Sequence, residues 1–400
     1  MAFIRDSEAF FKTLREATIA YFFDTGGILA GVIVASQLGI MQLSPWIIAM
    51  YPAVLSAKGM IGGLLSGRLS TALHIGTISP RLFGNTRSFH KLYQAIIVVT
   101  LITSVTLSLI SVVFGSLLWG ISLVDVFDIL AVVVATMTLG LSFTLVSIII
   151  AFVTFKKGLD PDVLVYPIMS TVADLGITVC YIIVLNLFFL NGFAGKQFVL
   201  AVGLAQVLIV LFLFFRNVHE REFTKTIREA LLTLVFVAFI VNVTGTVLSR
   251  ISRIVEGRKE IFTVYPALID TVGDVGSVIG STATTKLALG LLTPSFKSLK
   301  KHAAQILGAW TASLVMFTVF SALSLLLNGV FGLDAFLSFS SLLLTSNLIA
   351  VAVIALISFT ISILTYRRGL DPDNFVIPIE SSLADSVTSV ALLIVLLLMG

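Results

Sequence analysis

Two short motifs of this 400-residue chain occur twice, in the same order. The stretch Tyr51-Pro-Ala-Val-Leu returns as Tyr265-Pro-Ala-Leu-Ile, and Gly158-Leu-Asp-Pro-Asp returns as Gly369-Leu-Asp-Pro-Asp. The two offsets are 214 and 211 residues, so about half of the chain is duplicated with only small changes in length. The chain is therefore expected to fold as two similar units. In a membrane, such duplication is typical of a transport path between the two halves.

The composition places both copies in a membrane. Hydrophobic residues make up 58% of the chain, charged residues only 12%, and the mean hydropathy is +1.10, far outside the range of soluble domains. About 20 apolar residues are needed to cross the hydrocarbon layer, and eleven segments meet that requirement. They are residues 17–42, 45–66, 93–120, 127–155, 162–191, 197–215, 230–250, 260–283, 305–331, 335–364 and 374–399.

Five of these spans match five others through the repeat, and the span at 197–215 has no counterpart. Because a five-span unit ends on the side opposite its start, one extra crossing returns the chain, and the two repeats are predicted to be parallel. We therefore expect an all-α integral membrane protein with a pseudo-two-fold axis normal to the membrane. Its expected parts are an amphipathic N-terminal segment 1–16, a first repeat 17–193, a linker helix and cytoplasmic loop 194–229, and a second repeat 230–400.

Lysine and arginine placement predicts the orientation, because short cytoplasmic loops carry the excess of positive charge. With the N-terminus inside and the C-terminus outside, 19 of the 25 basic residues fall in cytoplasmic segments and 5 outside. We expect the cell membrane as location and lipid as surroundings. The segment Arg250–Glu260 is expected as a short surface helix, with a misassigned span as the alternative. The net charge of +4 follows from this bias and implies no nucleic-acid partner.

Ionisable residues inside the spans are the candidate functional groups, because they are costly there and usually face a partner or a watery path. Asp174 and Asp385 lie twelve residues beyond the last aspartate of each Asp-Pro-Asp element, about 18 Å along a helix and near the bilayer midplane. Asp270 and Asp274 lie one turn apart on one helical face. The deep set is completed by Asp24, Glu380 and Lys58.

The deep set holds six acids against one lysine. So many carboxylates are not tolerated dry and unpaired, so either several are protonated or a cation neutralises them. Oxygen ligands favour a hard ion such as Mg²⁺ or Ca²⁺. The structural alternative is that these acids only bond neighbouring helices or the backbone.

Two further repeated patterns have both a structural and a functional interpretation. Gly59 and Gly273 belong to glycine-rich stretches that let helices approach closely or expose carbonyl oxygens to an ion. The Asp-Pro-Asp elements suit helix N-termini. They also suit a ring of cation-attracting carboxylates at the inner mouth, made of Asp160, Asp162, Asp371 and Asp373.

These elements resemble a known family. The sequence around Lys58-Gly59, followed by Arg68-Leu-Ser-Thr-Ala-Leu-His-Ile-Gly76, resembles the signature of solute carrier family 41, the duplicated relatives of the MgtE magnesium channels. In both groups a Pro- and Gly-containing helix is followed by a helix that is entered by Asp-Pro and bears one membrane aspartate. The resemblance covers nearly the whole chain and implies Mg²⁺ permeation along the interface of two five-helix units.

Carried over residue by residue, the resemblance implies that Asp174 and Asp385 are the central Mg²⁺ carboxylates, with carbonyls of Ser170 and Ser381 as helpers. The family's Gly-Asn pair reads Gly59-Met60 in the first half and Gly273-Asp274 in the second, so a two-fold symmetric ion site is in doubt. Lys58 is expected either to act as a tethered cation that lowers ion occupancy or blocks the pore, or to pair with Asp270 or Asp274.

Three function classes follow. The leading one is a channel or Na⁺-coupled exchanger for a divalent cation, with Mg²⁺ as the first candidate. Na⁺ is the second candidate ion. We expect one chain to be sufficient, so that the protein functions as a monomer. The second is a proton- or Na⁺-coupled transporter of another solute that uses Asp174 and Asp385. The third, an intramembrane aspartyl protease, fails because Thr271 stands where its Gly-x-Gly-Asp motif needs glycine. We expect no enzymatic activity.

Overall fold

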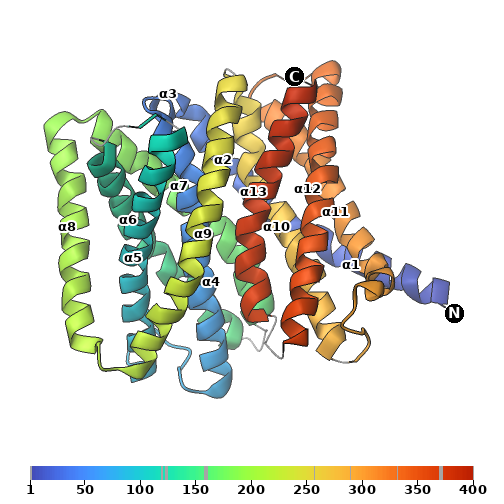
Figure 1. The fold of residues 1–400 in the computed structure, drawn as a ribbon, viewed down its shortest axis with the longest axis horizontal. Helices are drawn as coiled ribbons and strands as arrows, with labels where there is room; N and C mark the ends of the chain where they lie inside the picture. Colours follow the sequence, from blue (N-terminus) through green and yellow to red (C-terminus); the bar gives the residue numbers. More distant parts are fainter. Residues whose placement is uncertain are drawn as a thin grey trace. The chain divides into compact units, whose positions relative to one another are not determined.

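The computed structural model describes the backbone of residues 2–118, 120–121, 125–156, 161–255, 257–288, 290–330, 332–368 and 373–399. Within these ranges the chain forms α-helices and one short 3₁₀ helix, so the all-α prediction is confirmed (Figure 1). The helices are α1 (Ala2–Tyr21), α2 (Thr25–Ser36), α3 (Leu38–Met41), α4 (Pro45–Ile75), α5 (Arg87–Leu118), α6 (Asp125–Lys156), α7 (Pro161–Phe189), α8 (Gly192–Asn217), α9 (Arg221–Ile254), α10 (Lys259–Ala288), η1 (Phe296–Ser298), α11 (Leu299–Leu327), α12 (Leu333–Arg367) and α13 (Asp373–Met399).

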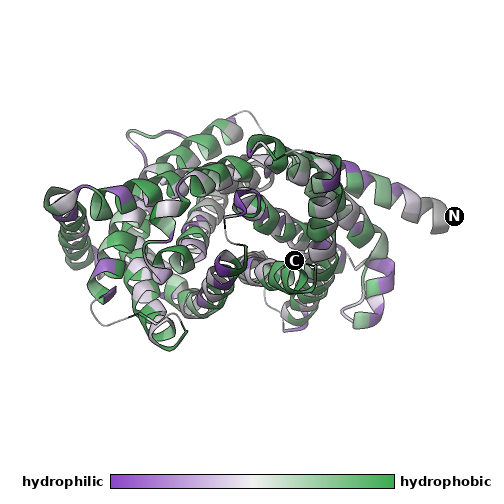
Figure 2. Ribbon diagram, turned by 90° about the horizontal axis from the view of Figure 1, so that it is seen from above, coloured by the Kyte–Doolittle hydropathy of each residue, from purple (hydrophilic) through white to green (hydrophobic). Residues whose placement is uncertain are grey.

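Among the described residues, nine helical segments are long and apolar enough to cross a membrane. They correspond to nine of the eleven predicted spans, and hydrophobic residues dominate the helices in Figure 2. The other two predicted spans, 45–66 and 260–283, fall in α4 and α10. These helices have 31 and 30 residues, long enough to cross, and they carry charged residues within their apolar stretch. The chain is an integral membrane protein.

The N-terminal part differs from the prediction in one respect, because the predicted span 17–42 is not one continuous helix. Residues 2–21 form the single helix α1, a turn follows at residues 22–24, and α2 begins at Thr25. Helix α1 packs against α11, where Thr13 and Ala17 are buried and a Cβ on Gly308 would lie 2.8 Å from the Phe10 carbonyl oxygen. One face of this helix is therefore covered by protein, while Phe11 and Ile19 are exposed, and the predicted surface location of residues 1–16 stays a prediction.

The charged segment after α9 is also different from the prediction. Helix α9 continues to Ile254 and α10 begins at Lys259, so a short connection replaces the expected surface helix. Two of its charges neutralise each other, because Arg258 Nε lies 2.8 Å from a Glu260 carboxylate oxygen. The basic residues Arg250 and Arg253 lie in the last turns of α9.

The described helices group into two compact units, and neither coincides with one sequence repeat. Unit 1 consists of residues 1–36 and 247–400, and unit 2 of residues 37–246. In unit 1, α2 packs along α10. In unit 2, α9 contacts α5 through Phe239 and Phe114, whose ring centroids are 5.2 Å apart. Each sequence repeat therefore contributes its first span to the unit that holds the other repeat's remaining helices.

Two glycines make this exchange of first helices possible. A Cβ added to Gly31 of α2 would lie 2.0 Å from the Thr263 carbonyl oxygen, and a Cβ added to Gly245 of α9 would lie 1.9 Å from the Ala49 carbonyl oxygen. Both glycines and both carbonyls are related by the same offset of 214 residues, so one contact occurs twice. Only glycine permits two helix backbones to approach this closely.

The proline of each repeat lies beside this contact. Pro52 lies inside α4 and Pro266 inside α10, and each lacks the N–H that would bond the carbonyl four residues earlier. In α10 that carbonyl belongs to Phe262, and its oxygen would lie 2.8 Å from a Cβ on Gly31. Gly31 thus brings its Cα–H near the Phe262 carbonyl, which has no helical N–H partner because of Pro266. Such Cα–H···O contacts between helices are weak but recurrent.

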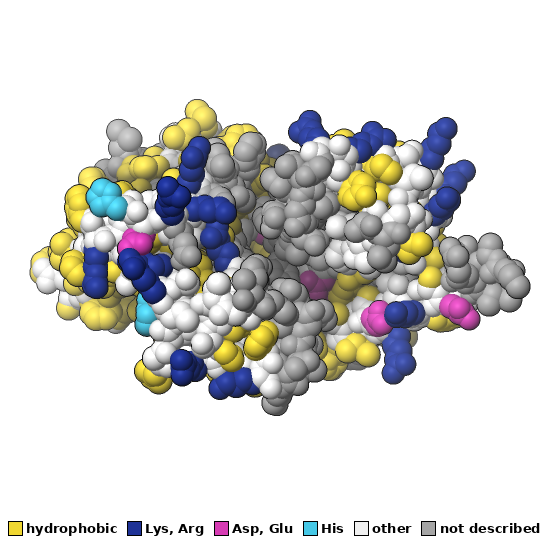
Figure 3. All heavy atoms as spheres, turned by 90° about the horizontal axis from the view of Figure 1, so that it is seen from below, with side chains coloured by type: hydrophobic (Ala, Val, Ile, Leu, Met, Phe, Trp, Pro, Cys, Tyr) yellow, Lys and Arg dark blue, Asp and Glu magenta, His cyan; other side chains and the backbone are white. Residues whose placement is uncertain are grey.

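Contacts at helix ends support part of the predicted topology. In unit 2, Arg87 at the start of α5 forms an ion pair with Glu220, and Lys91 donates a hydrogen bond to Asn217 at the end of α8. In unit 1, Arg367 Nε donates to the Pro294 carbonyl over 2.5 Å. In unit 2 the loops before α5 and after α8 therefore lie at the same end of the helices, and in unit 1 so do the loops before α11 and after α12. The charge pattern assigns all four loops to the same side of the membrane. Lysine and arginine side chains gather at that end of unit 2, at the left of Figure 3.

Candidate functional site

The repeated Tyr-Pro element forms the centre of helix packing in unit 2. The Tyr51 hydroxyl of α4 and the Thr178 hydroxyl of α7 are 2.9 Å apart, and Tyr181 donates a hydrogen bond of 2.6 Å to the Ile47 carbonyl. The two tyrosine rings are stacked with centroids 6.1 Å apart. These buried contacts fix the register of α4 against α7, the helix that bears Asp174.

The same arrangement occurs in unit 1. The Tyr265 hydroxyl of α10 lies 2.8 Å from the Ser389 hydroxyl of α13, and Ser389 also donates to the Asp385 carbonyl over 2.7 Å. Tyr265 is 214 residues after Tyr51 and Ser389 is 211 residues after Thr178, the two offsets of the sequence repeat. Each membrane aspartate therefore lies one helical turn before the hydroxyl that anchors its helix to the Tyr-Pro helix.

In unit 2, Asp174 is accompanied by the buried cation Lys58. The Lys58 side chain is 2% exposed, and its ammonium has no hydrogen-bond partner among the described residues. Asp174, 8% exposed, attracts it electrostatically. Asp270 and Asp274, the predicted partners of Lys58, belong to unit 1, so that pairing stays a prediction. Among the described residues, the α4–α7 pair of unit 2 thus carries a positive group, Lys58, and a negative group, Asp174.

Unit 1 has a different set of charges. Asp24, in the turn before α2, is buried and accepts a hydrogen bond of 2.6 Å from the Thr271 hydroxyl of α10. Asp270 and Asp274 of α10 and Asp385 of α13 are half-buried. These two helices pack together, and a Cβ on Gly273 would lie 3.8 Å from the Ala384 Cβ. The described acids of α10, α13 and the turn before α2 thus belong to one compact unit.

In the first repeat, no neighbouring atoms crowd Gly59, the first residue of the altered Gly-Asn pair. Gly59 is exposed, and a Cβ added to it would meet nothing within 4 Å, although it lies in the middle of α4. Met60 is half-buried beside it. The exposed backbone at Gly59 is compatible with a wet surface on this side of α4, next to the position of Lys58.

Several predicted residues cannot be placed. Asp160 and Asp371 lie outside the described residues, and the side chains of Asp162, Ser170, Asp373, Glu380 and Ser381 also lie outside the described part. Among the side chains that are described, no group of three or more His, Cys, Asp or Glu residues has the spacing of a metal site. The mouth ring and the complete ligand set therefore stay predictions.

Three hydrogen-bond partners were not expected from the sequence: Thr178, Ser389 and Thr271. Thr178 and Ser389 occupy equivalent positions, so an alignment of the repeats contained the signal for the tyrosine–hydroxyl pair. Thr271 is 247 residues from Asp24 in sequence and has no repeat equivalent, because Ala57 takes its place in the first repeat. No sequence signal indicated that contact.

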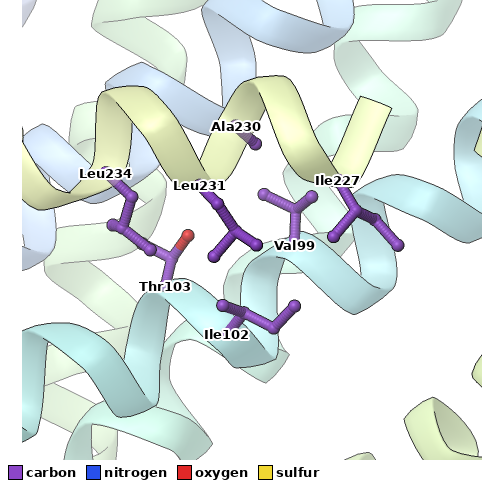
Figure 4. Close-up of a pocket in the computed structure, with 7 residues that line it drawn as sticks. All are labelled: Val99, Ile102, Thr103, Ile227, Ala230, Leu231 and Leu234. Carbon is purple, nitrogen blue, oxygen red and sulfur yellow. The ribbon is translucent and has the colours of Figure 1, made fainter. Parts of the chain in front are cut away.

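A shallow apolar pocket lies between α5 and α9 in unit 2 (Figure 4). Thr103 is the one polar residue among the seven that line it, and the others are aliphatic: Val99, Ile102, Ile227, Ala230, Leu231 and Leu234. Without a carboxylate, this pocket does not suit a divalent cation.

Comparison with known proteins identifies the family. The model of the family MgtE, described as divalent cation transporter, matches residues 51–184 and 265–395. The two matches begin at Tyr51 and Tyr265, so the family boundary coincides with the repeat. No curated protein matches the chain. Among solved structures, the crystal structure of the eukaryotic MATE transporter AtDTX14 is similar at 14% identity with a TM-score of 0.37, over 100% of this chain and 97% of that chain.

The matches to the MgtE model together cover about two thirds of the 400 residues, once in each repeat. They contain the Tyr-Pro helices, the Asp-Pro-entered helices and both equivalent aspartates, the features that the resemblance predicted. The chain therefore belongs to the MgtE family of divalent cation transporters, with the transmembrane domain of the family present twice.

Proposed function

We propose that the protein transports Mg²⁺, and that Asp174 and Asp385 are the carboxylates that attract it in the two repeats. The observation that carries this proposal is the MgtE match in both halves of the chain, each containing one of the two equivalent aspartates. Oxygen ligands suit a hard ion, and Mg²⁺ keeps several waters and needs few direct carboxylate contacts. An ion of this kind does not require three protein acids in one cluster.

The buried tyrosine–hydroxyl pairs support this role of the aspartates. Because each pair lies one turn from its aspartate, it holds that carboxylate at a fixed depth in the helix bundle. A charge at such a depth is costly unless a cation or water accompanies it. In unit 1, Asp270 and Asp274 add negative charge on the same helix that contacts α13, so they assist Asp385 in drawing the ion in.

The proposed path has unequal halves. Met60 supplies no hard ligand where the second repeat has Asp274, and Lys58 accompanies Asp174. We further propose that one chain is sufficient for transport, that the N-terminus is cytoplasmic in the cell membrane, and that Na⁺ is the candidate coupling ion if the protein is an exchanger. The first repeat (17–193) and the second (230–400) are the proposed transport domains.

Mg²⁺ flux into proteoliposomes with an entrapped indicator tests the proposal. We expect flux in the wild type, loss of at least about tenfold in Asp174→Asn combined with Asp385→Asn, and no change in Asp334→Asn, which removes an exposed carboxylate at the start of α12. Dependence on an opposing Na⁺ gradient would indicate an exchanger. If folded wild-type protein shows no Mg²⁺ flux under any gradient, the proposal is wrong and a proton- or Na⁺-coupled transporter of another solute replaces it.

A further inference from the structure

Lys58 stands out among the buried charges of the described residues. A lysine that is 2% exposed and makes no hydrogen bond there is unusual, because burying an ammonium without partners is strongly unfavourable. The corresponding position in the second repeat is Val272, 214 residues later, which is fully buried and apolar. Helix packing at the equivalent position of the second repeat therefore does without a charge, whereas the first repeat carries one.

The surroundings of the ammonium show what it faces. A Cβ on Gly62, one turn further along α4, would lie 3.8 Å from Lys58 Nζ, so the side chain extends along its own helix over a residue without a side chain. Lys58 follows Tyr51 by seven residues, about two helical turns, so it lies on the face of α4 that packs against α7, and Asp174 of α7 attracts the ammonium electrostatically. The positive charge of Lys58 thus faces the helix that bears Asp174, the carboxylate that we propose as the Mg²⁺ ligand of this repeat.

We infer that Lys58 is a resident cation of the first repeat, which compensates Asp174 when no Mg²⁺ is bound and competes with Mg²⁺ for it. This inference rests on the proposed function and deepens it. An incoming ion must displace the ammonium from Asp174 or accept its repulsion, so Lys58 sets the affinity of the path for divalent cations. The second repeat, with Val272 at this position, has no such competitor there. The two repeats therefore hold the ion with unequal strength.

The competition predicts a specific coupling between two side chains. Removing the charge in Lys58→Gln or Lys58→Met raises Mg²⁺ affinity by about tenfold or more, because a positive charge next to a divalent ion in a site of low dielectric is strongly repulsive. The same substitution in an Asp174→Asn background leaves the affinity unchanged, since the ligand for which Lys58 competes is gone. Lys58→Arg keeps the charge and the wild-type affinity.

The test is a Mg²⁺ titration of purified protein in detergent, with affinity obtained from the rise of the apparent melting temperature and, in parallel, the concentration dependence of flux in proteoliposomes. Lys297→Gln, which removes an exposed charge, is the matched control and should behave as wild type. A residue with only a structural role would lower the melting temperature without Mg²⁺ and leave the affinity unchanged. Lys58→Met provides a second variant if Lys58→Gln does not fold.

The outcomes separate the inference from the proposed function. If the wild type binds Mg²⁺ and the Lys58 variants bind it equally or more weakly, or if their gain persists without Asp174, the competition is refuted while Mg²⁺ transport stands. If neither the wild type nor any Lys58 variant responds to Mg²⁺ in either assay, the proposed function itself fails.

Discussion

The close backbone contacts of Gly31 and Gly245 give a sharp test of the fold. Gly31→Ala and Gly245→Ala each place a Cβ about 2 Å from a carbonyl oxygen of the neighbouring helix, where real Cβ contacts essentially never fall below 3.0 Å. The two helices must therefore separate by at least about 1 Å. Because the obstacle is backbone within a helix and not the end of a flexible side chain, no rotamer change relieves it.

The magnitude follows from two opposing effects. Overpacking costs about 1–3 kcal/mol, and an obstacle made of backbone belongs at the upper end of that range. Alanine is the better helix former by about 1 kcal/mol, which offsets part of the cost. We expect each variant to be destabilised by about 1–2 kcal/mol, and the two by similar amounts, because they disturb the same contact in the two units.

The control is Gly203→Ala in α8, where the added Cβ would lie 3.6 Å from a Val134 side-chain carbon, an ordinary contact. It should be as stable as the wild type or more stable. The assay is the monodisperse fraction that survives heating in detergent, at one fixed heating time because membrane proteins seldom unfold reversibly. A loss of a few degrees in Gly31→Ala and Gly245→Ala, but not in the control, is expected. If both variants are as stable as the control, the exchanged first helices are not packed as described.

Three further changes test single contacts. Tyr265→Phe removes a buried hydrogen bond to α13 and should lower stability by about 1 kcal/mol in the same heating assay; an unchanged transition would show that the pair adds nothing. Thr271→Val removes the hydrogen bond to Asp24 and should lower stability by about 1.5–3 kcal/mol, and by much less in an Asp24→Ala background, which has no acceptor; equal losses in both would exclude the contact. The hydrogen bond from Arg87 lowers the pKa of Glu220 below its ordinary value, so this pair stabilises the fold at neutral pH and the stabilisation is lost as the pH falls through that lowered pKa. Glu220→Gln should therefore reduce the acid sensitivity of melting below about pH 5, and an identical pH profile would contradict the pair.

Much of the architecture was visible in the sequence because it depends on local composition and on the repeat. Nine of the predicted spans reappear as helices of sufficient length and hydrophobicity, and the matches to the MgtE model begin at the repeated Tyr51 and Tyr265. The two connections that differ from prediction, at residues 22–24 and 255–258, are short breaks between helices. Hydropathy averages over about 20 residues and cannot place such a break within an apolar or a charged stretch.

The candidate site divides in the same way. The equivalent aspartates 174 and 385 were recognised from their spacing after the Asp-Pro-Asp elements, and their role as ion ligands stays a prediction; that their helices pack against the Tyr-Pro helices was learned from the structure. The side chains that surround the buried charged groups could not be predicted from the sequence. The pairing of Lys58 with Asp270 or Asp274 stays a prediction, whereas the electrostatic attraction between Lys58 and Asp174 within unit 2 was not expected from the sequence.

The sequence by itself determined that this is a duplicated, all-helical membrane protein of the MgtE family, because hydrophobic length and repeated spacing are properties of the chain alone. Only the tertiary structure decided that the first span of each repeat packs with the other repeat's helices, at Gly31 and Gly245, and that Asp24 accepts its hydrogen bond from Thr271. The physical reason is that two similar repeats present similar packing surfaces. A helix can therefore be accommodated by either copy, and close backbone contacts between residues far apart in sequence settle which one it joins.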